Sequence, residues 1–361
     1  MKAKRFMLIL CTIVLVPALL LSYAAMYIHP QIVWFTVFFG LAYFPILVLN
    51  IVLSFAWFFS SKKMFVAMLV VLLLGYEAHT ATFALGKQNT KSNNGEIRLV
   101  TYNVKGFDFT NEQPLREPIM EAIAYCEADI LCLQEFNTYH NKAGEPDNLN
   151  EIKKSTGLSH HYYHKSYENK KKTRSYGLII FSRFPVISSG QVEYPSISKM
   201  NTTIWADVIV NSDTMRIYSS HLQSNQLTHS DFEFIGKTET GDTLGFDSRR
   251  VAGKFKNSYT MRAGQVDSIR KAMDNSPYPM VIAGDFNDTP VSYTYRTISA
   301  GMDDAFLKCS RGIGATYIPF PLVRIDYILY SPDLISARSY QRIRVKGSDH
   351  SMVKAILEFQ P

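Results

Sequence analysis

A run of 56 consecutive residues, from Phe6 to Ser61, contains no Asp, Glu, Lys or Arg. Water-soluble domains rarely contain so long an uncharged run, whereas one bilayer span needs only about 20 mostly apolar residues. The sequence has 361 residues, and at about 100–200 residues per domain this length accommodates a membrane region plus one large domain. A single soluble globule is therefore excluded.

Residues 1–86 are expected to form a transmembrane region of about three helices, at residues 6–28, 32–59 and 64–85. A cleaved signal peptide would have a shorter apolar core than the first of these segments. The third segment is interrupted by Glu77. An ionisable residue deep in a bilayer is costly, so Glu77 either lies near the outer headgroups, which we favour, or has a functional role.

Positive charge predicts the orientation of these helices. Lys2, Lys4 and Arg5 precede the first segment and Lys62-Lys63 separates the second from the third, whereas the His29–Gln31 turn has neither Lys nor Arg. The positive-inside rule places the basic flanks in the cytoplasm. Three crossings then leave the rest of the chain outside the cytoplasm, and a third segment that only lies on the surface would leave it inside.

Residues 87–95 are polar and are expected to form a linker, and residues 96–361 alternate short apolar strands with helical stretches. That alternation predicts a layered α/β domain with helices packed on sheets. The formal charge is +7, and residues 87–361 carry +3 of it. That surplus is small for a domain that wraps duplex nucleic acid by counterion release, although it leaves room for a basic groove.

Polar side chains stand at or near the ends of six predicted strands. They are Asn103, Gln134-Glu135, His221, Asp285 to Asn287, Asp326 and Asp349-His350. Residues i and i+2 of an extended segment point to the same side, so Asp285 and Asn287 can face one pocket. Taken singly, each has an ordinary explanation, such as a turn at Gly284-Asp285 or a helix cap at Glu135. An acid among apolar neighbours, as at Asp326, needs a partner.

The order of these motifs resembles the endonuclease/exonuclease/phosphatase superfamily over residues 96–361. The motifs are TYNV (101–104), LQE (133–135), SHL (220–222), GDFN (284–287), RIDYI (324–328) and SDH (348–350). That superfamily includes deoxyribonuclease I-like nucleases, abasic-site endonucleases, neutral sphingomyelinases and inositol-polyphosphate 5-phosphatases. The resemblance implies a four-layered α/β sandwich, with two sheets face to face and helices outside, here in a membrane-anchored, bacterial-type member.

The resemblance also implies a divalent-metal site. Asn103 and Glu135 would lie at this site, and Glu135 would be a direct metal ligand. Asp349 is a third expected metal-site residue. All-oxygen sites suit Mg²⁺, with Mn²⁺ as the alternative. Zinc fits less well because no thiolate or His set has ligand spacing. The histidines of the SHHYYHK stretch are expected to be exposed or to contact phosphate.

The remaining roles concern the phosphate. The resemblance implies that His221 hydrogen-bonds the scissile group and that Asn287 helps to position it. Asp285 would orient or deprotonate the attacking water. Asp349 would pair with His350, which faces the phosphate, and Asp326 would support this cluster from beneath. Spacing leaves the identity of the general base open.

Three segments bear on the substrate. The basic stretch His164–Arg174 is either a solvated loop or a positive rim for an anionic substrate or anionic lipids. The insertion Asn225–Ala263 fits a lid over an acidic substrate, a membrane contact or an externally packed helix with a solvated basic face. Tyr317, Phe320 and Leu322 precede RIDYI and would contact a base, a sugar or an acyl chain.

The sequence thus favours a membrane-tethered, Mg²⁺-dependent phosphoric ester hydrolase that acts on phosphodiesters or phosphomonoesters, with lipid-linked phosphates as the first substrate hypothesis. A DNA or RNA nuclease and an enzyme for soluble phosphoesters are the alternatives within the enzyme class. A non-catalytic, membrane-anchored binding module is the alternative outside it. The expected partners are the phosphoester and the bilayer, with no obligate protein partner. The expected location is the bacterial inner membrane, with an extracytoplasmic catalytic domain.

Overall fold

The computed structural model describes residues 2–89, 95–107, 115–194, 196, 199–225 and 243–360. The chain divides into two compact units. The first, here called the helical unit, comprises Met1–Thr82, Ser224–Ala263 and Asp288–Thr297. The second, here called the sheet unit, comprises Phe83–Gln223, Gly264–Asn287 and Ile298–Pro361. Two segments from the C-terminal part of the chain thus belong to the same unit as the N-terminal helices.

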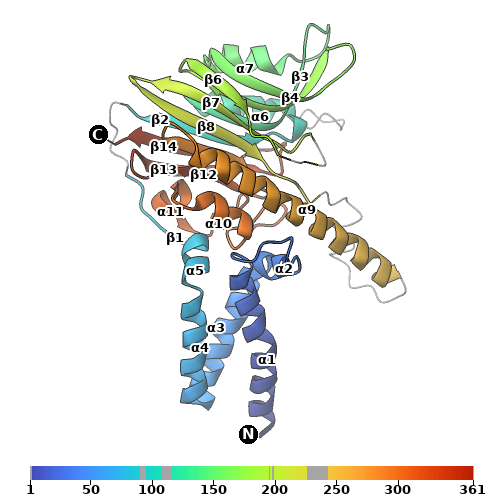
Figure 1. Ribbon diagram of the computed structural model, residues 1–361, viewed down its shortest axis with the longest axis vertical. Helices are drawn as coiled ribbons and strands as arrows, with labels where there is room; N and C mark the ends of the chain where they lie inside the picture. Colours follow the sequence, from blue (N-terminus) through green and yellow to red (C-terminus); the bar gives the residue numbers. More distant parts are fainter. Residues whose placement is uncertain are drawn as a thin grey trace. The chain divides into compact units, whose positions relative to one another are not determined.

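The sheet unit contains two six-stranded sheets (Figure 1). The first has the order β13-β14-β2-β3-β5-β4. Its strands are β2 (Ile97–Asn103), β3 (Ile130–Tyr139), β4 (His160–Glu168), β5 (Arg174–Ser182), β13 (Ile335–Arg344) and β14 (Ser351–Phe359). The second has the order β10-β12-β9-β8-β7-β6. Its strands are β6 (Val186–Gln191), β7 (Thr203–Val210), β8 (Asp213–His221), β9 (Met280–Asp285), β10 (Asp303–Asp304) and β12 (Asp326–Tyr330).

The two sheets pack face to face through one apolar cluster. Leu99 and Ile180 of the first sheet and Ile217, Val281 and Ile328 of the second are among its fully buried members. The alternation of apolar residues along each strand accounts for this inner face. A two-stranded pair, β1 (Ala84–Leu85) with β11 (Arg311–Gly312), lies outside both sheets.

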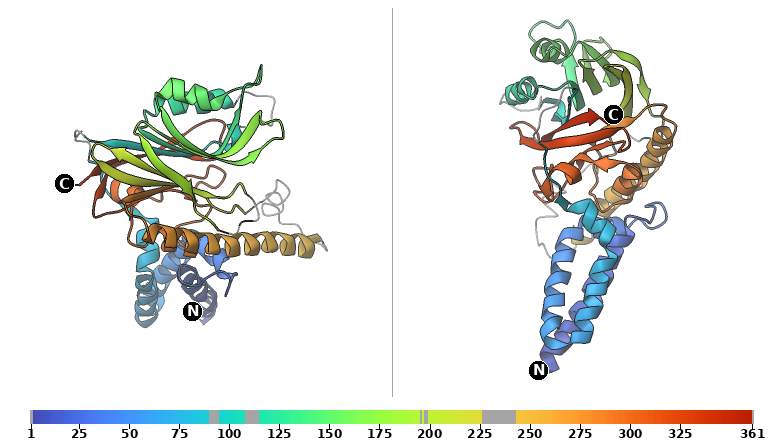
Figure 2. Two further views of the ribbon diagram at one scale, coloured as in Figure 1. Left: turned by 45° about the horizontal axis from the view of Figure 1, so that its top comes forward. Right: turned by 90° about the vertical axis from the view of Figure 1, so that its left-hand side faces the viewer.

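Helices cover the outer faces (Figure 2). The first sheet buries a second apolar cluster against α6 (Arg116–Tyr125) and α7 (Asn148–Thr156). On the other sheet, Tyr218 of β8 donates its hydroxyl to the Ala272 carbonyl at 3.2 Å, on the part of α9 (Thr243–Asp274) that belongs to the sheet unit. The short helices of the sheet unit are η1 (Lys105–Phe107) and α11 (Ala305–Cys309), whereas α10 (Tyr293–Ser299) begins in the helical unit. The predicted four-layered α/β sandwich is confirmed.

Strand register aligns the polar strand ends. β2 and β3 are parallel, with Asn103 opposite Gln134, and β8 and β9 are parallel, with His221 opposite Asp285. Parallel strands end on the same edge, so their terminal side chains meet there. Gly284 permits the close approach of β8, because a Cβ on it would lie 2.0 Å from the Ser220 carbonyl oxygen.

The N-terminal helices of the helical unit are α1 (Lys2–Ala24), α2 (Thr36–Leu41), α3 (Tyr43–Ser60), α4 (Lys62–Leu74) and α5 (Tyr76–Thr82). Two of them, α1 and α3, are long and apolar enough to cross a membrane, and α4 with α5 forms a third candidate bent by 59°. The second predicted segment is thus divided between α2 and α3, and the third is bent. The bend lies at Gly75, where a Cβ would meet the Tyr23 ring at 2.2 Å.

Buried polar groups connect α1 to α3. Asn50 donates to the Leu15 carbonyl at 3.0 Å, and the Trp57 indole donates to the Thr12 hydroxyl at 2.9 Å. Such interhelical hydrogen bonds are a recognised source of association between apolar helices. Part of the insertion Asn225–Ala263, residues 226–242, lies outside the described residues, and much of the remainder is the first part of α9.

Candidate active site

One amide connects a carboxylate from each sheet. Asn103 ends β2, Glu135 lies within β3 of the same sheet, and Asp285 ends β9 of the other sheet. The Nδ2 atom of Asn103 donates to Glu135 Oε1 at 3.1 Å and to Asp285 Oδ2 at 3.1 Å. Asn103 and Asp285 are both buried, so the hydrogen bond between them is shielded from water, whereas the one to Glu135 is only partly buried. The interface between the sheets therefore ends in a cluster of functional groups.

Two imidazoles approach the same carboxylates. His221 Nε2 lies 3.7 Å from Glu135 Oε1 and 3.8 Å from Asp285 Oδ2, and His350 Nε2 lies 3.6 Å from Asp285 Oδ2. These distances exceed that of a normal hydrogen bond. The Nδ1 atom of His221 is buried without a hydrogen-bond partner among the described residues. Both rings are thus positioned to contact an anion placed beside Asp285.

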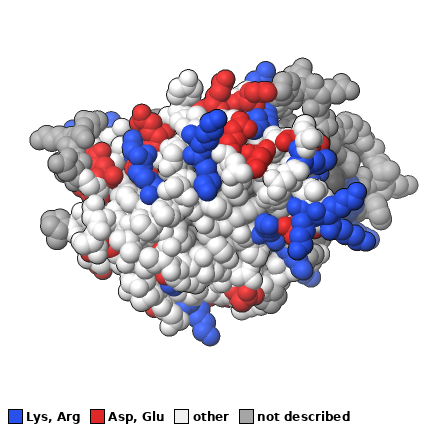
Figure 3. Space-filling view, turned by 90° about the horizontal axis from the view of Figure 1, so that it is seen from above, with Lys and Arg blue, Asp and Glu red and all other residues white. Residues whose placement is uncertain are grey.

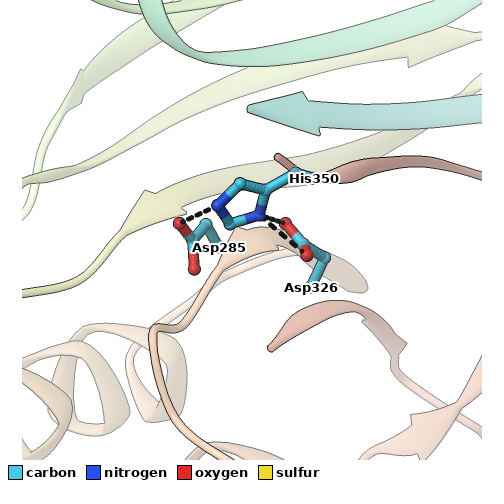
Figure 4. Close-up of side chains that lie close together, drawn as sticks. All are labelled: Asp285, Asp326 and His350. Carbon is cyan, nitrogen blue, oxygen red and sulfur yellow. Dashed lines mark hydrogen bonds and ion pairs between the residues drawn. The ribbon is translucent and has the colours of Figure 1, made fainter. Parts of the chain in front are cut away.

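His350 lies between two acids (Figure 4). Its Nδ1 atom is 3.0 Å from Asp326 Oδ2 and 3.1 Å from Asp326 Oδ1, and all three side chains are buried. Burial opposes the positive charge of the ring, but Asp326 and Asp285 outweigh burial and raise the pKa of His350 to about 10. His350 is therefore an imidazolium at neutral pH.

The carboxylate partner of His350 differs from the expected one. Asp349 was predicted to pair with His350, but the hydrogen-bonded acid is Asp326. Asp349 lies 3.7 Å from the Lys105 ammonium instead. The reason is register, because antiparallel β9 and β12 place Asp326 directly opposite Asp285 and hence under the ring. Asp326, which was predicted to support the cluster from beneath, therefore makes a direct hydrogen bond to His350.

Two residues of the cluster have a left-handed backbone. Glu135 has φ of +53° where the pairing of β3 with β5 is irregular between Leu133 and Phe136, and Asn287 also has φ of +53°. Positive φ is uncommon for residues other than glycine, and such strain gathers at functional sites. The Asn287 amide N–H donates to Asp285 Oδ1 at 2.8 Å and its side chain donates to the Leu222 carbonyl at 3.0 Å.

The carboxylate of Glu135 is an oxygen ligand of the kind that a hard divalent cation takes. The side chain of Glu135 keeps 28% of its surface exposed, so it is accessible from solvent, and Asn103 fixes its orientation. A different group of ligand atoms, from Asp285, Asp326 and His350, also lies within 4.8 Å of one another. In that group, His350 Nδ1 is already hydrogen-bonded to Asp326, so the ring offers a cation its Nε2 atom.

Sequence reasoning missed two residues at the cluster. Lys105 follows Asn103 by two positions, has φ of +47°, and donates its backbone N–H to Asn103 Oδ1 at 3.0 Å. Burial raises the pKa of Tyr176, and the charge of Glu135 and a hydrogen bond to it raise that pKa further. The spacing Asn-x-Lys was the available signal for Lys105. Tyr176 lies two residues after the basic stretch His164–Arg174, and no motif of the sequence singles it out.

An aromatic pair lies next to His350. The rings of Tyr317 and His350 are 5.4 Å apart, and Tyr317 stacks on Phe320 at 6.0 Å. Phe320 is 43% exposed and Leu322 is 52% exposed. The loop that the sequence assigned to substrate contact therefore does lie beside the cluster and presents apolar surface to solvent.

Comparison with known proteins agrees with this geometry. The model of the Endonuclease/Exonuclease/phosphatase family matches residues 100–350, which include the six motifs, and that of a domain of unknown function matches residues 4–82. None of the curated proteins compared with the chain matches it.

Solved structures of low identity share the fold. The catalytic domain of human Nocturnin, solved with a bound sulfate anion, is 16% identical with a TM-score of 0.52, over 75% of this chain and 96% of that one. A family protein from Bacteroides thetaiotaomicron is 17% identical with a TM-score of 0.52, over 75% and 100% of the two chains. One from Beutenbergia cavernae is 17% identical with a TM-score of 0.51, over 74% and 72%. Members of this family hydrolyse phosphoester bonds. The chain belongs to the Endonuclease/Exonuclease/phosphatase family.

Proposed function

We propose that this protein is a membrane-tethered, divalent-metal-dependent phosphoesterase that acts on lipid-linked phosphates. The observation that carries the proposal is the convergence on Asp285 of the Asn103 amide, at 3.1 Å, and of the His350 ring, at 3.6 Å. Hydrolysis of a phosphoester requires a positioned water and groups that stabilise negative charge on the phosphoryl oxygens. The cluster contains residues for both tasks.

Each residue then has a defined role. Asp285, whose Oδ1 is held by the Asn287 N–H, orients the water and accepts its proton as the water oxygen bonds to phosphorus. The ester P–O bond breaks, and the departing oxygen takes a proton from solvent. His350 and His221 donate from Nε2 to the phosphoryl oxygens, and Asp326 keeps His350 charged.

Glu135 would hold the cation, with Asn103 orienting it, and Mg²⁺ is the ion that such oxygen ligands favour. When bound, the ion neutralises charge on the phosphoryl oxygens. The carboxylate of Asp349 is paired with Lys105. Its expected role as a third metal ligand therefore stays a prediction. The Lys105 ammonium supplies further positive charge at the cluster.

Two features of the helical unit support a lipid-linked substrate. Its α9 part packs on α2, the short helix between the two candidate spans, with Phe255 and Phe38 rings 5.3 Å apart. Lys256 lies over the Trp34 ring at 5.9 Å. Trp at the ends of spans is typical of the headgroup region, so α9 brings positive charge to the depth of anionic headgroups.

A nuclease is the second candidate, and the stacked pair Tyr317 and Phe320 favours it, because aromatic side chains bind unpaired bases by stacking. The distribution of surface charge is less favourable to a nuclease. On the face drawn in Figure 3, basic and acidic groups are mixed along one edge, a separate group of basic side chains stands at the right, and the central area is uncharged. Within the part of this face that the structure describes, no continuous basic band is present for a duplex.

A substrate panel tests the proposal. The full chain in detergent is assayed with Mg²⁺ on a phosphatidylinositol phosphate, sphingomyelin, plasmid DNA, single-stranded DNA and a generic phosphodiester. We expect one of the two lipids to be hydrolysed with the highest kcat/KM of the panel. Preferential cleavage of single-stranded DNA would favour the nuclease, and no hydrolysis of any substrate would contradict the phosphoesterase itself.

A further inference from the structure

The chain between α1 and α3 lies at one end of both candidate spans. Asn50 of α3 contacts Leu15 of α1 and Trp57 contacts Thr12, so the two helices run in opposite directions within the helical unit (Figure 1). Residues 25–42, which contain α2, join their adjacent ends. In a protein whose α1 and α3 cross a bilayer, this connection therefore lies at the headgroup level on one side of the membrane.

The connection carries the kinds of side chain that are found at that level. Ile32 is 79% exposed and Phe35 is 46% exposed, and Trp34 stands next to Phe35 in the sequence. Trp is enriched where spans meet headgroups, because its ring is apolar and its N–H is polar. Exposed apolar side chains beside it gain free energy by entering lipid instead of facing water. The connection thus has a surface suited to the boundary between headgroups and acyl chains.

A group of polar side chains in the helical unit marks the same end of the spans. Tyr27, in the connection, donates its hydroxyl to Glu77 Oε2 at 2.7 Å, and Arg296 Nε lies 3.5 Å from that oxygen. The Arg296 guanidinium also lies over the Tyr27 ring at 4.3 Å. All three side chains are exposed. Such a group can be hydrated among headgroups, whereas the hydrocarbon core of a bilayer would make it costly.

The part of α9 that belongs to the helical unit packs against this connection. Val251, Phe255 and Tyr259 form a buried apolar cluster with Val37 of α2, and the Phe255 ring is 5.3 Å from that of Phe38. The three residues of α9 recur every four positions and therefore share one face of the helix. This packing holds the other faces of this part of α9 at the level of α2.

The same part of α9 is rich in basic residues. Residues 248–263 contain no Asp or Glu, and their basic residues are Arg249, Arg250, Lys254, Lys256 and Arg262. Arg249 and Lys256 are exposed, and because they are seven positions apart they lie on the same side of the helix. Lys256 Nζ lies 5.9 Å from the centre of the Trp34 ring. Among the residues that the structure describes, no carboxylate forms an ion pair with either of these two cations.

We propose that Trp34, Arg249 and Lys256, here called the α9 surface, bind the headgroup of an anionic phospholipid. The lipid phosphate lies at the depth of Trp34 and meets two cations that lack a carboxylate partner, and the acyl chains run beside Ile32 and Phe35. This lipid is a bound ligand and not the substrate. The inference rests on the membrane tethering in the proposed function, but its readout is lipid binding and requires no turnover.

The test measures which lipid lies next to Trp34. The full chain is placed in phosphatidylcholine nanodiscs with a chelator, so that no lipid is hydrolysed. A fixed fraction of the lipid has brominated acyl chains and is either phosphatidylglycerol, which is anionic, or phosphatidylcholine. Bromine quenches indole fluorescence on contact. Because the chain has three tryptophans, the Trp34 signal is the difference between each protein and its Trp34→Phe counterpart.

We expect phosphatidylglycerol to bind next to Trp34 with about tenfold higher affinity than phosphatidylcholine, since each Lys or Arg near an anionic lipid surface contributes about fivefold. The preference should fall as salt screens the charges. Arg249→Gln with Lys256→Gln should remove most of it, whereas Arg249→Lys with Lys256→Arg should keep it. Lys153→Gln with Lys154→Gln, on α7 of the sheet unit, removes the same charge and should leave the preference unchanged.

The outcomes separate the lipid site from the proposed function. Equal quenching by the two lipids in the unaltered protein would overturn the site, and so would a preference that survives Arg249→Gln with Lys256→Gln. An equal loss in the α7 variant would assign the attraction to net charge and would also overturn it. A chain that hydrolyses no panel substrate but keeps the preference leaves the site standing while the phosphoesterase fails. Protein that stays outside the nanodiscs would refute the tethering and the site together.

Discussion

The Nδ1 atom of His350 lies 3.0 Å from Asp326 Oδ2, on a strand whose register sets Asp326 opposite Asp285. The ring is therefore held between an acid that it hydrogen-bonds and an acid that it faces. Its pKa is raised to about 10 from an ordinary value of 6.5. A raised pKa favours the protonated form, so the charge is present at neutral pH and is lost as the pH rises through about 10.

Asp326→Asn should shift the alkaline limb of the activity to lower pH. The substitution removes the largest influence that raises the pKa of His350 and leaves burial, which lowers it. Loss of one close opposite charge lowers such a pKa by about 1–3 units. The measurement is kcat/KM against pH, with Asp303→Asn as the control, since Asp303 pairs with Lys308 at 2.8 Å. An unchanged limb would show that His350 does not act as an imidazolium.

Asp285→Asn should abolish most turnover while the fold remains. The asparagine keeps the shape of a side chain that is 1% exposed, but it cannot accept a proton from water. Removal of a general base typically costs about 10²–10⁴-fold in rate. The measurement is kcat on the generic diester beside the melting temperature. Asp213→Asn, at the exposed start of β8, is the control. Wild-type turnover in Asp285→Asn would exclude the assigned role.

Much of the site could be predicted because its residues adjoin apolar runs. Asn103, His221 and Asp285 each end a strand, and two parallel strand pairs place these ends on neighbouring edges. A strand assignment therefore fixes roughly where each side chain goes. Motif order then identified the sandwich, since few other folds present these groups in that sequence.

The remainder depends on contacts that no local pattern encodes. Asp326 became the partner of His350 through the antiparallel register of β12 with β9, a pairing between segments far apart in sequence. The adjacency of Asp349 to His350 in the chain suggested the wrong acid. The inclusion of Asp288–Thr297 in the helical unit likewise depends on tertiary packing, of Val291 against Gly40 and of Arg296 against Glu77, that apolar periodicity cannot reveal.

Chelation should abolish activity, and Mg²⁺ or Mn²⁺ should restore it. Glu135 is the carboxylate proposed to bind the cation. The Glu135→Gln variant should therefore need a higher Mg²⁺ concentration to reach half of its maximal rate. Asn103→Ala, which removes the group that orients Glu135, should weaken metal affinity by about 10–100-fold. Calorimetric titration with Mg²⁺ measures both. Glu145→Gln is the control, because Glu145 pairs with Lys142 at 3.1 Å. Full activity in excess chelator would contradict the metal proposal.

The C-terminus should lie outside the cytoplasm. Lys62 and Lys63 begin α4, and the positive-inside rule keeps them in the cytoplasm, so α4 with α5 would form the third crossing despite the 59° bend. A reporter that is active only outside the cytoplasm, fused after Pro361, should therefore be active, whereas the same reporter fused after Ser61 should be silent. Replacing both lysines with glutamine should reduce the activity of the C-terminal fusion. A silent C-terminal fusion with an intact chain would mean that α4 and α5 do not cross, and the hydrolase would then act on the cytoplasmic face.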